Sequence, residues 1–522
     1  MTNKKLALSV LVSFVMFPAF SSAQSMGALK QLYSETGVKA SPVAAAVPAA
    51  SRPMAVPQEY SGEESTSYSG TAVTIWHAIA QQVGDLLPSS DAPSFEQISE
   101  RVLNAAKSRY YPARRAGQAS LFTDPGFVAE FERATGARFT DGNYAYFLIN
   151  GEASFAQKDY LLQHARKSIF VSSWAFYDDT TGYEAAQMLI AAHRRGVDVK
   201  VMVDNIVEAS HGFKVIDMMR KAGVPVVLHK DPERYSDIWH VKTMIVDDTY
   251  AITGGMNFGD VYSHKGSGSI KWRDTDVIYS GPAVMDAKRL LGREWNSQVK
   301  SRNLGYGLVD VNSSEADGYR GGDARVAVLL ENPPKQSPIL ISIVKAMYAA
   351  THVINIENAY FVAIPAVTQA VLDARARGVE VNILTNSAES IDSEGKPIVD
   401  AMNKCLVPLY QAGVNIYLKQ GDQQTLHSKF MTVDGEFASV GSYNLHPRGE
   451  RSDSEMNVNV LGGREVAQLD AAYANDLAVA KRITSAKELE TKPGVVSSIM
   501  SDYFYAQLDH QSAGAGALLN GR

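Results

Sequence analysis

The chain has 522 residues, a formal net charge of −6 and a sequence pI of about 6.0. Apolar residues make up 45% of it and charged residues 20%, a composition that excludes a disordered or fibrous protein. The length is sufficient for two domains that each bury a core. Nucleic acid is not an expected partner, because its binding usually requires a basic patch or stripe.

The N-terminus has the plan of a secretory signal peptide. Lys4 and Lys5 are followed by the almost wholly apolar run Leu6 to Phe20 and by the small residues Ser21-Ser22-Ala23. The apolar run is shorter than the ~20 residues that a membrane span needs. We therefore expect cleavage after Ala23, a mature chain without a transmembrane span, and a periplasmic or secreted protein.

Residues 24–135 are expected to form a linker followed by a helical extension. Up to about residue 90 the chain is rich in Ala, Pro, Ser and Gly, which provide little material for a core, whereas Phe95 to Ser108 has helical spacing. The single cysteine, Cys405, lies in a helical pattern from about Pro397 to Ala412 and is interpreted as a small core residue. No internal disulfide is possible, so burial alone must stabilise the fold.

An internal repeat organises the rest of the chain. A strand at Ser168 to Trp174, a helix at Gly182 to Arg195 and a strand at Val197 to Asp204 recur as Val353 to Glu357, Pro365 to Arg377 and Val379 to Thr385. The pattern predicts an α/β fold of two repeated domains, 136–315 and 316–505, with mixed, mostly parallel sheets packed around one shared site. A flexible tail is expected at 506–522.

The same spaced set of residues occurs in both repeats. In each, a Lys follows a His by 2 positions, an Asp by 7, a Gly by 14 and an Asn by 17. One copy would be a weak motif, but two copies in register are very hard to obtain by chance. The two sets are His240, Lys242, Asp247, Gly254 and Asn257, and His427, Lys429, Asp434, Gly441 and Asn444.

The spacing suggests how these residues act. The segments Trp239–Val246 and Leu426–Val433 resemble strands, in which His and Lys two positions apart share a face. Two such pairs form a site for an anionic phosphodiester: the lysines neutralise its oxygens, one imidazole attacks phosphorus and the other protonates the leaving oxygen. Asp247 and Asp434 face the other way, in turn-like sequences, and are assigned a structural role.

Further side chains complete the predicted site. Gly254 and Gly441, with Ser442 beside the latter, suit close approach of the backbone to a ligand, and Asn257 and Asn444 can donate to phosphate oxygens. A nucleophilic histidine also needs a carboxylate on its other ring nitrogen. Asp274 follows the first His by 34 residues and Glu455 follows the second by 28, so both are candidates for that role.

These residues resemble the phospholipase D superfamily, whose hallmark is the duplicated His-x-Lys-x4-Asp motif, and the resemblance covers about residues 150 to 480. Within it, the segments Gly254 to Asp260, Trp272 to Thr275 and Asn444 to Arg448 look most like those of bacterial cardiolipin synthases. The resemblance implies a two-step reaction through a phosphohistidine, with no metal or other cofactor. It suggests His240 as the nucleophile and His427 as the general acid, although the sequence leaves this order open.

The sequence departs from the synthase pattern at three positions near the second motif. His446, Arg448-Gly449 and Asp453 stand where that pattern has Asp, Arg-Ser and Asn, which leaves the acceptor open.

We therefore expect an exported phosphodiesterase or phosphatidyltransferase that meets glycerophospholipid as a peripheral enzyme, by hydrolysis or transfer to an alcohol. A monomer is expected because one chain holds both motifs. The alternatives are an exported endonuclease of the same superfamily and a degenerate lipid-binding protein.

Overall fold

The structure is a computed structural model that describes residues 93–107, 115, 118–205, 211–231, 237–313, 321–333, 336–393 and 395–491. The expected signal peptide, the linker up to about residue 90 and the tail 506–522 lie outside these residues. None of the helices in the described ranges is long and apolar enough to cross a membrane.

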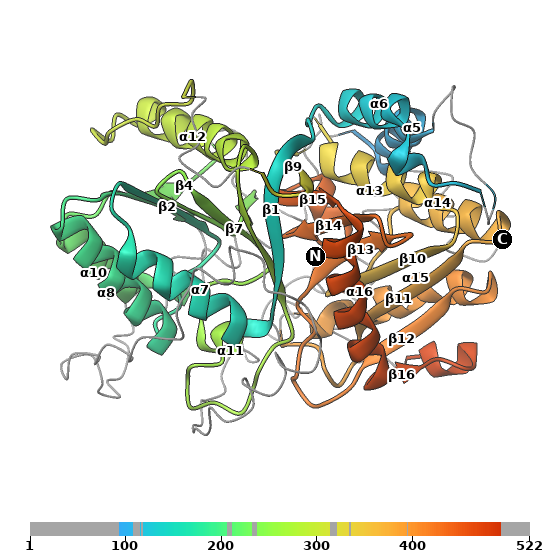
Figure 1. The fold of residues 1–522 in the computed structure, drawn as a ribbon. Helices are drawn as coiled ribbons and strands as arrows, with labels where there is room; N and C mark the ends of the chain where they lie inside the picture. The colour runs from blue at the N-terminus through green and yellow to red at the C-terminus, as the bar shows by residue number, and fades with distance from the viewer. Residues whose placement is uncertain are drawn as a thin grey trace, which may run out of the picture.

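The two repeats have the same order of elements, apart from one short strand and one short helix in the first and an added edge strand in the second (Figure 1). The first consists of β1 (Thr140–Ile149), α7 (Asn150–His164), β2 (Ser168–Ser173), α8 (Thr180–Arg194), β3 (Asp198–Asp204), α10 (Phe213–Lys221), β4 (Val226–His229), β5 (Ile238–Trp239), β6 (Thr243–Val246), β7 (Tyr250–Gly254), α11 (Asp260–Ser263), β8 (Thr275–Ser280) and α12 (Ala283–Ser301). The second consists of β9 (Ala324–Glu331), α13 (Pro338–Ala349), β10 (Val353–Asn358), α14 (Pro365–Ala376), β11 (Glu380–Asn386), α15 (Val399–Gln411), β12 (Asn415–Lys419), β13 (Lys429–Val433), β14 (Phe437–Gly441), β15 (Asp453–Leu461), α16 (Gly463–Ala478) and β16 (Lys481–Arg482). The repeated elements predicted from the sequence are confirmed, with ends that differ by one or two residues.

The strands of both repeats join in one sheet. Its order is β16-β12-β11-β10-β13-β14-β15-β9-β1-β8-β7-β6-β2-β3-β4, and β5 pairs with β15. Apart from the added edge strand β16, the order reads the same from either edge, because each element of one repeat occupies the place of its counterpart in the other. The short contact between β1 and β9 joins the two halves at the centre.

The sheet is mixed, as predicted, but it is not mostly parallel. Parallel pairing is confined to β2–β3, β3–β4, β10–β11, β11–β12 and the short β5–β15 ladder, and the other ladders are antiparallel. The reason is that the second half of each repeat returns through hairpins, such as β6–β7 and β13–β14, which can only form antiparallel pairs.

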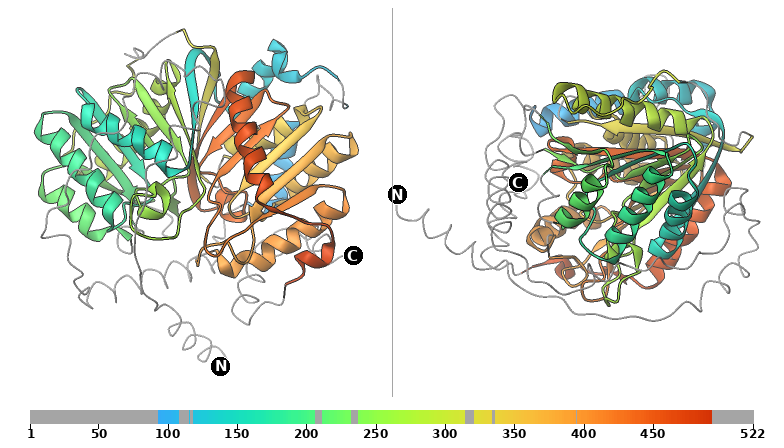
Figure 2. Two further views of the ribbon diagram at one scale, coloured as in Figure 1. Left: turned by 60° about the horizontal axis from the view of Figure 1, so that its bottom comes forward. Right: turned by 90° about the vertical axis from the view of Figure 1, so that its left-hand side faces the viewer.

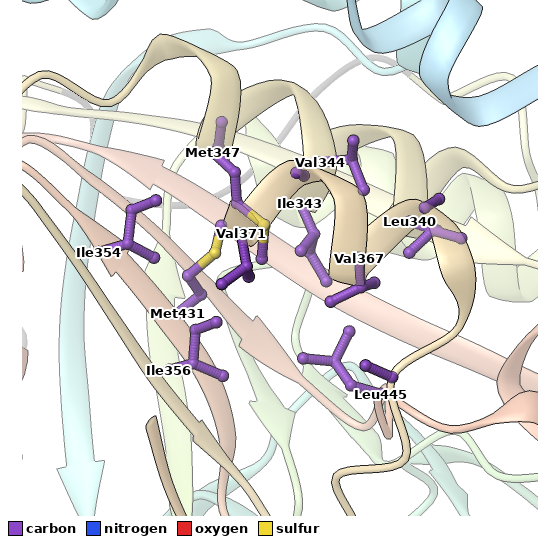
Figure 3. Close-up of a cluster of buried hydrophobic side chains, with 14 of the residues drawn as sticks. Leu340, Ile343, Val344, Met347, Ile354, Ile356, Val367, Val371, Met431 and Leu445 are labelled. Atoms are coloured by element: carbon purple, nitrogen blue, oxygen red, sulfur yellow. The ribbon is translucent and has the colours of Figure 1, made fainter. Parts of the chain in front are cut away.

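Three apolar clusters hold the layers together. One packs α7, α8 and α10 on the first repeat's strands, and another packs α13, α14 and α15 on the second repeat's strands. Figure 3 shows part of the latter, where Ile343 and Met347 of α13 and Val371 of α14 meet Ile356 and Met431 of the sheet. The third cluster lies between the repeats, with α12 and α16, and holds the two halves in fixed register. Figure 2 shows the strands of both halves side by side with helices outside them.

The N-terminal extension packs on the second repeat, although it precedes the first. Helix α5 (Phe95–Ala106) begins with a capping box of Ser94 and Gln97, and α6 (Pro125–Thr135) is capped by Asp124 and has proline in its first turn. Both helices lie beside α13 (Figure 1), and their apolar faces belong to the core of the second repeat. The chain therefore packs on the second repeat before it enters the centre of the sheet at β1.

Candidate active site

The motif histidines lie just before the strands that were predicted to contain them. The expected strand Trp239–Val246 is broken, because β5 ends at Trp239 and β6 begins at Thr243, and the expected strand Leu426–Val433 begins only at Lys429. The backbone N–H of His240 donates to the carbonyl of Ser454 at 2.9 Å, and that of His427 donates to the carbonyl of Arg273 at 2.7 Å. Each histidine is therefore attached to the opposite repeat.

Each histidine also meets a carboxylate from the other repeat. Nδ1 of His240 lies 2.9 Å from both carboxylate oxygens of Glu455, and Nδ1 of His427 lies 2.7 Å from Oδ2 of Asp274. Both carboxylates are fully buried. A carboxylate at this position keeps the proton of a neutral ring on Nδ1 and leaves the Nε2 lone pair available for chemistry. The pairing is crossed, so both repeats are needed to orient either histidine.

The motif lysines lie beside these histidines. Nζ of Lys242 donates to the carbonyl of His240 at 2.6 Å. Nζ of Lys429 donates to the carbonyl of His427 and lies 3.0 Å from its Nε2. Both lysines are almost completely buried. Two buried ammonium groups require compensating negative charge, which the phosphate of a substrate would supply.

The motif aspartates lie away from the histidines and bind backbone. The carboxylate of Asp247 accepts from the N–H groups of Arg166, Lys167 and Ser168 at 2.7 to 3.1 Å. Asp434 accepts in the same way from residues 351 to 353. Both have positive φ, near 54°, at the turn of a hairpin. They fasten each hairpin to the start of a neighbouring strand, which is a structural arrangement.

The motif glycines face the neighbouring strand rather than an open pocket. A Cβ added to Gly254 would lie 2.0 Å from a carboxylate oxygen of Asp276, and one added to Gly441 would lie 2.2 Å from the amide oxygen of Asn457. The expected close approach is therefore observed, but its partner is protein. Substitution at either glycine should separate two strands of the inter-repeat core.

The other predicted substrate contacts are mostly engaged within the protein. The amide nitrogen of Asn257 donates to the hydroxyl of Tyr262 at 3.1 Å, and its oxygen accepts from Ser173. Oγ of Ser442 accepts from the N–H of Met456 at 3.0 Å. Asn444 is also buried, and its side-chain oxygen has no hydrogen-bond partner among the described residues. Of these three, Asn444 has the most freedom to contact a ligand.

Aromatic rings surround the histidines, and sequence reasoning missed them. Trp174 lies edge-on to His240, with ring centroids 5.8 Å apart, and Trp272 stacks on His427 at 5.3 Å. Tyr262 and Tyr360 approach His427 edge-on. Two features of the sequence could have identified them. Trp174 directly follows β2, and Trp272 precedes the candidate site residue Asp274 by two residues.

A buried carboxyl pair behind Glu455 was also missed. Glu331 lies directly opposite Glu455 in the β9–β15 ladder, and Glu450 is near enough to raise its pKa in addition to the effect of burial. Glu450 accepts from Tyr443 and Ser337. Single glutamates without a repeated counterpart give no signal in the sequence, since only the fold brings them together.

Comparison with known proteins agrees with this geometry. A family model described as "Cardiolipin synthase, PLD-like domain" matches residues 160–264 and 343–477, and each matched segment contains one histidine–lysine pair. The chain is a member of the phospholipase D superfamily. As in the superfamily's duplicated motif, both copies contribute to one site.

Among curated proteins, the chain is 26% identical over 410 residues to cardiolipin synthase 2 of Staphylococcus epidermidis, covering 76% of this chain and 80% of that protein. It is 25% identical over 358 residues to cardiolipin synthase A of Pseudomonas fluorescens, covering 67% and 72%. The structure of phosphatidylserine synthase from Haemophilus influenzae superposes with a TM-score of 0.57 at 15% identity, covering 73% of this chain and 98% of that one. This last likeness concerns the fold alone.

Burial makes the motif histidines neutral. It lowers the pKa of His240 well below the usual 6.5, and the nearby charge of Lys242 lowers it further. Burial and Lys429 lower the pKa of His427 to about 4, against the opposing effect of Asp274. Burial alone would raise the pKa of Asp274, but His427 and Lys429 bring it below its usual value. His427 is thus held by an ionised carboxylate.

The lysines predict the pH dependence of this phospholipase D-type site. Burial lowers the pKa of Lys242 to about 7 and that of Lys429 to about 8. A lysine is charged only below its pKa, so the free enzyme loses its phosphate-binding charges as the pH rises through these values. Because His427 must also be protonated as the general acid and its pKa is about 4, kcat/KM for an anionic phosphodiester should already decrease with rising pH. It should fall more steeply above about pH 7 to 8, by roughly a further tenfold per unit.

The measurement is kcat/KM from about pH 5 to 10 with a substrate that does not titrate in this range. The fall in kcat alone should come at higher pH, because bound phosphate raises the pKa of both lysines. A kcat/KM that rises from pH 7 to 9 would contradict the assignment.

The crossed pairing predicts which step a carboxylate variant impairs. Asp274→Asn weakens the hydrogen bond to His427, a residue 153 positions away in the sequence. We expect kcat to fall by about 10² to 10⁴-fold, as for other histidines deprived of their carboxylate. Activity measured with a substrate whose leaving group needs no proton should recover. The matched control is Asp286→Asn on α12, an ion-pair partner of Arg289, which should retain activity. A loss that is equal for both kinds of substrate would place Asp274 elsewhere in the mechanism.

Proposed function

We propose that this protein is a phosphatidyltransferase that acts on glycerophospholipids through a phosphohistidine intermediate. The observation that carries the proposal is the crossed arrangement of two neutral histidines, each oriented by a carboxylate of the other repeat and accompanied by a buried lysine. This arrangement supplies a nucleophile, a proton donor and compensating charge at one place.

In the first step, Nε2 of His240 attacks the phosphorus of the lipid. A P–N bond forms while the P–O bond to the headgroup alcohol breaks, and His427 gives its proton to the leaving oxygen. His427 must be protonated for this step, and the negative charge of bound phosphate favours that state. Lys242 and Lys429 neutralise the phosphate oxygens. Burial raises the pKa of Glu455 well above its usual value, and the positive charge that develops on the ring of His240 favours its ionised form, which stabilises that charge in turn.

In the second step, an acceptor hydroxyl attacks the phosphohistidine. His427 takes the proton of that hydroxyl, a new P–O bond forms, and the P–N bond to His240 breaks. Transfer to the alcohol of a second lipid and hydrolysis by water differ only in this attacker. The similarity to cardiolipin synthases supports transfer to a headgroup hydroxyl of phosphatidylglycerol.

Lipid product analysis tests the proposal. Purified protein is incubated with vesicles of phosphatidylglycerol, and the products are resolved by chromatography and mass spectrometry. Cardiolipin together with free glycerol is the expected result, and phosphatidate alone would identify a hydrolase. If neither product forms while plasmid DNA is cleaved, the protein is a nuclease of the superfamily instead.

We also propose that the mature protein is exported and meets the lipid at a membrane surface. The apolar run Leu6 to Phe20 and the small residues before Gln24 support this proposal. N-terminal sequencing of the protein from the periplasmic and extracellular fractions tests it. A mature chain that begins at Gln24 is expected, and an uncleaved chain in the cytoplasmic fraction would contradict it.

A further inference from the structure

We propose that His446 recognises the headgroup alcohol of the substrate, and that it favours neutral polyol headgroups such as glycerol over cationic ones such as choline. This inference rests on the proposed phosphatidyltransferase function. It concerns the side of the site at which the alcohol leaves and the acceptor enters.

His446 is a third histidine beside the two that perform the chemistry. Its ring centroid lies 6.4 Å from that of Tyr360, which in turn lies 6.2 Å from the ring of His427. It is also near enough to His240 to contribute to the low pKa of that residue, and Lys429 affects the pKa of His446 itself. The side chain therefore lies near Tyr360 and within electrostatic reach of His240 and Lys429.

The local backbone fixes which ring nitrogen of His446 carries the proton. His446 is the N-cap of the short turn Pro447–Glu450, and its Nδ1 accepts from the N–H of Gly449 at 3.4 Å. Burial lowers the pKa of His446 to about 4, although Asp453 opposes this effect. The ring is therefore neutral, with its proton on Nε2. Nε2 is a hydrogen-bond donor, and it has no hydrogen-bond partner among the described residues.

Of the charged groups near His446, Arg448 and Asp453 offset each other, whereas Asp392 keeps its charge and raises the pKa of Lys429. Arg448 and Asp453 form an ion pair at 3.0 Å, and Asp392 accepts from the hydroxyl of Tyr360 at 2.5 Å. The positive charge that serves the phosphate belongs to Lys242 and Lys429. His446 thus adds an uncharged donor to the region beyond the phosphate.

An uncharged donor suits a hydroxyl oxygen. A glycerol headgroup offers hydroxyl groups that accept from Nε2–H, whereas a quaternary ammonium group has no acceptor. His427 protonates the leaving alcohol and deprotonates the incoming one, so both alcohols occupy the same place. One donor near His427 can therefore orient the leaving headgroup and the acceptor alike.

The test compares headgroup preference in wild type, His446→Asn and His446→Ala. Vesicles contain equal amounts of phosphatidylglycerol and phosphatidylcholine, and the loss of each lipid gives the ratio of the two kcat/KM values. Asn is a good N-cap, so His446→Asn keeps the turn but lacks the reach of the imidazole. His193→Asn on α8, away from the site, is the control.

We expect His446→Asn to lower the preference for phosphatidylglycerol by about tenfold, the effect of one lost hydrogen bond. The loss of phosphatidylcholine should stay within about twofold of wild type, and so should both rates in His193→Asn. The ratio of cardiolipin to phosphatidate should fall together with the preference. If His446→Ala does not fold, His446→Asn decides the question, because its cap is retained.

The outcomes distinguish this inference from the function on which it rests. A wild-type protein that turns over phosphatidylglycerol, together with folded variants whose preference is unchanged, overturns the role of His446 alone. A wild-type protein that consumes neither lipid overturns the phosphatidyltransferase proposal, and the role of His446 with it.

Discussion

His240→Ala is expected to abolish turnover, with kcat lowered by about 10⁶-fold, as when a covalent nucleophile is removed. The alanine variant has no atom that can form the P–N bond, so neither transfer nor hydrolysis can proceed by the two-step route. The measurement is the rate of headgroup release from phosphatidylglycerol at saturating substrate. The loss should be the same for activated and natural substrates, because the missing group attacks phosphorus in both.

A matched control separates this effect from unfolding. His240 lies at the junction of the repeats and contacts Glu455 and Trp174, so its loss also removes packing. His240→Gln keeps a polar side chain of similar reach without nucleophilic character and should be equally inactive with a native melting temperature. Residual activity above about 1% of wild type in either variant would contradict the nucleophilic role.

His427→Ala should lower kcat for phosphatidylglycerol by about 10² to 10⁴-fold, the usual contribution of a general acid. The phosphorus can still be attacked by His240, but the leaving glycerol oxygen departs without a proton. The effect should be much smaller for a p-nitrophenyl phosphodiester, whose leaving group is stable as an anion. Release of p-nitrophenol in a stopped-flow burst measures the first step directly.

The second step provides the internal check on His427. Without this residue the acceptor hydroxyl has no base, so a burst of p-nitrophenol followed by slow turnover is expected. His240→Ala should show no burst at all. If the two variants behave alike with the activated substrate, the roles assigned to the two histidines are wrong.

The sequence predicts the duplicated fold well, because each element has its own local signal. The helix predicted from Pro365 to Arg377 is observed as Pro365–Ala376, since proline in the first turn and glycine after the last turn mark its ends. Whether neighbouring strands pair in parallel or antiparallel was harder to predict. The expectation of a mostly parallel sheet came from the βαβ half of each repeat, whereas hairpins in the other half make antiparallel pairs the majority.

The sequence predicts which residues form the site, but it does not predict which of them contact each other. Spacing identified both histidines, both lysines and the candidates Asp274 and Glu455. It could not show that each carboxylate binds the histidine of the other repeat, because this depends on how the halves pack. Nor could spacing show that Gly254 and Gly441 make room for a strand, since a close approach to a ligand requires the same residue.

His446 is a residue whose role could not be predicted from the sequence. It stood out in the sequence only as a departure from the synthase pattern, and the local pattern gives no indication of its ring orientation. The fold adds the hydrogen bond from Gly449 to Nδ1, which leaves the proton on Nε2, and it adds the proximity to Tyr360.

The measurement that tests the central claim most directly is to trap the covalent intermediate. Phosphatidylglycerol labelled with ³²P is mixed with His427→Ala protein, the reaction is quenched at alkaline pH where phosphohistidine survives, and the labelled peptide is sequenced. Label on His240, removed by acid and absent from a His240→Gln/His427→Ala double variant, is the result we predict. Label on another residue, or turnover with inversion at phosphorus and no label, would contradict the account.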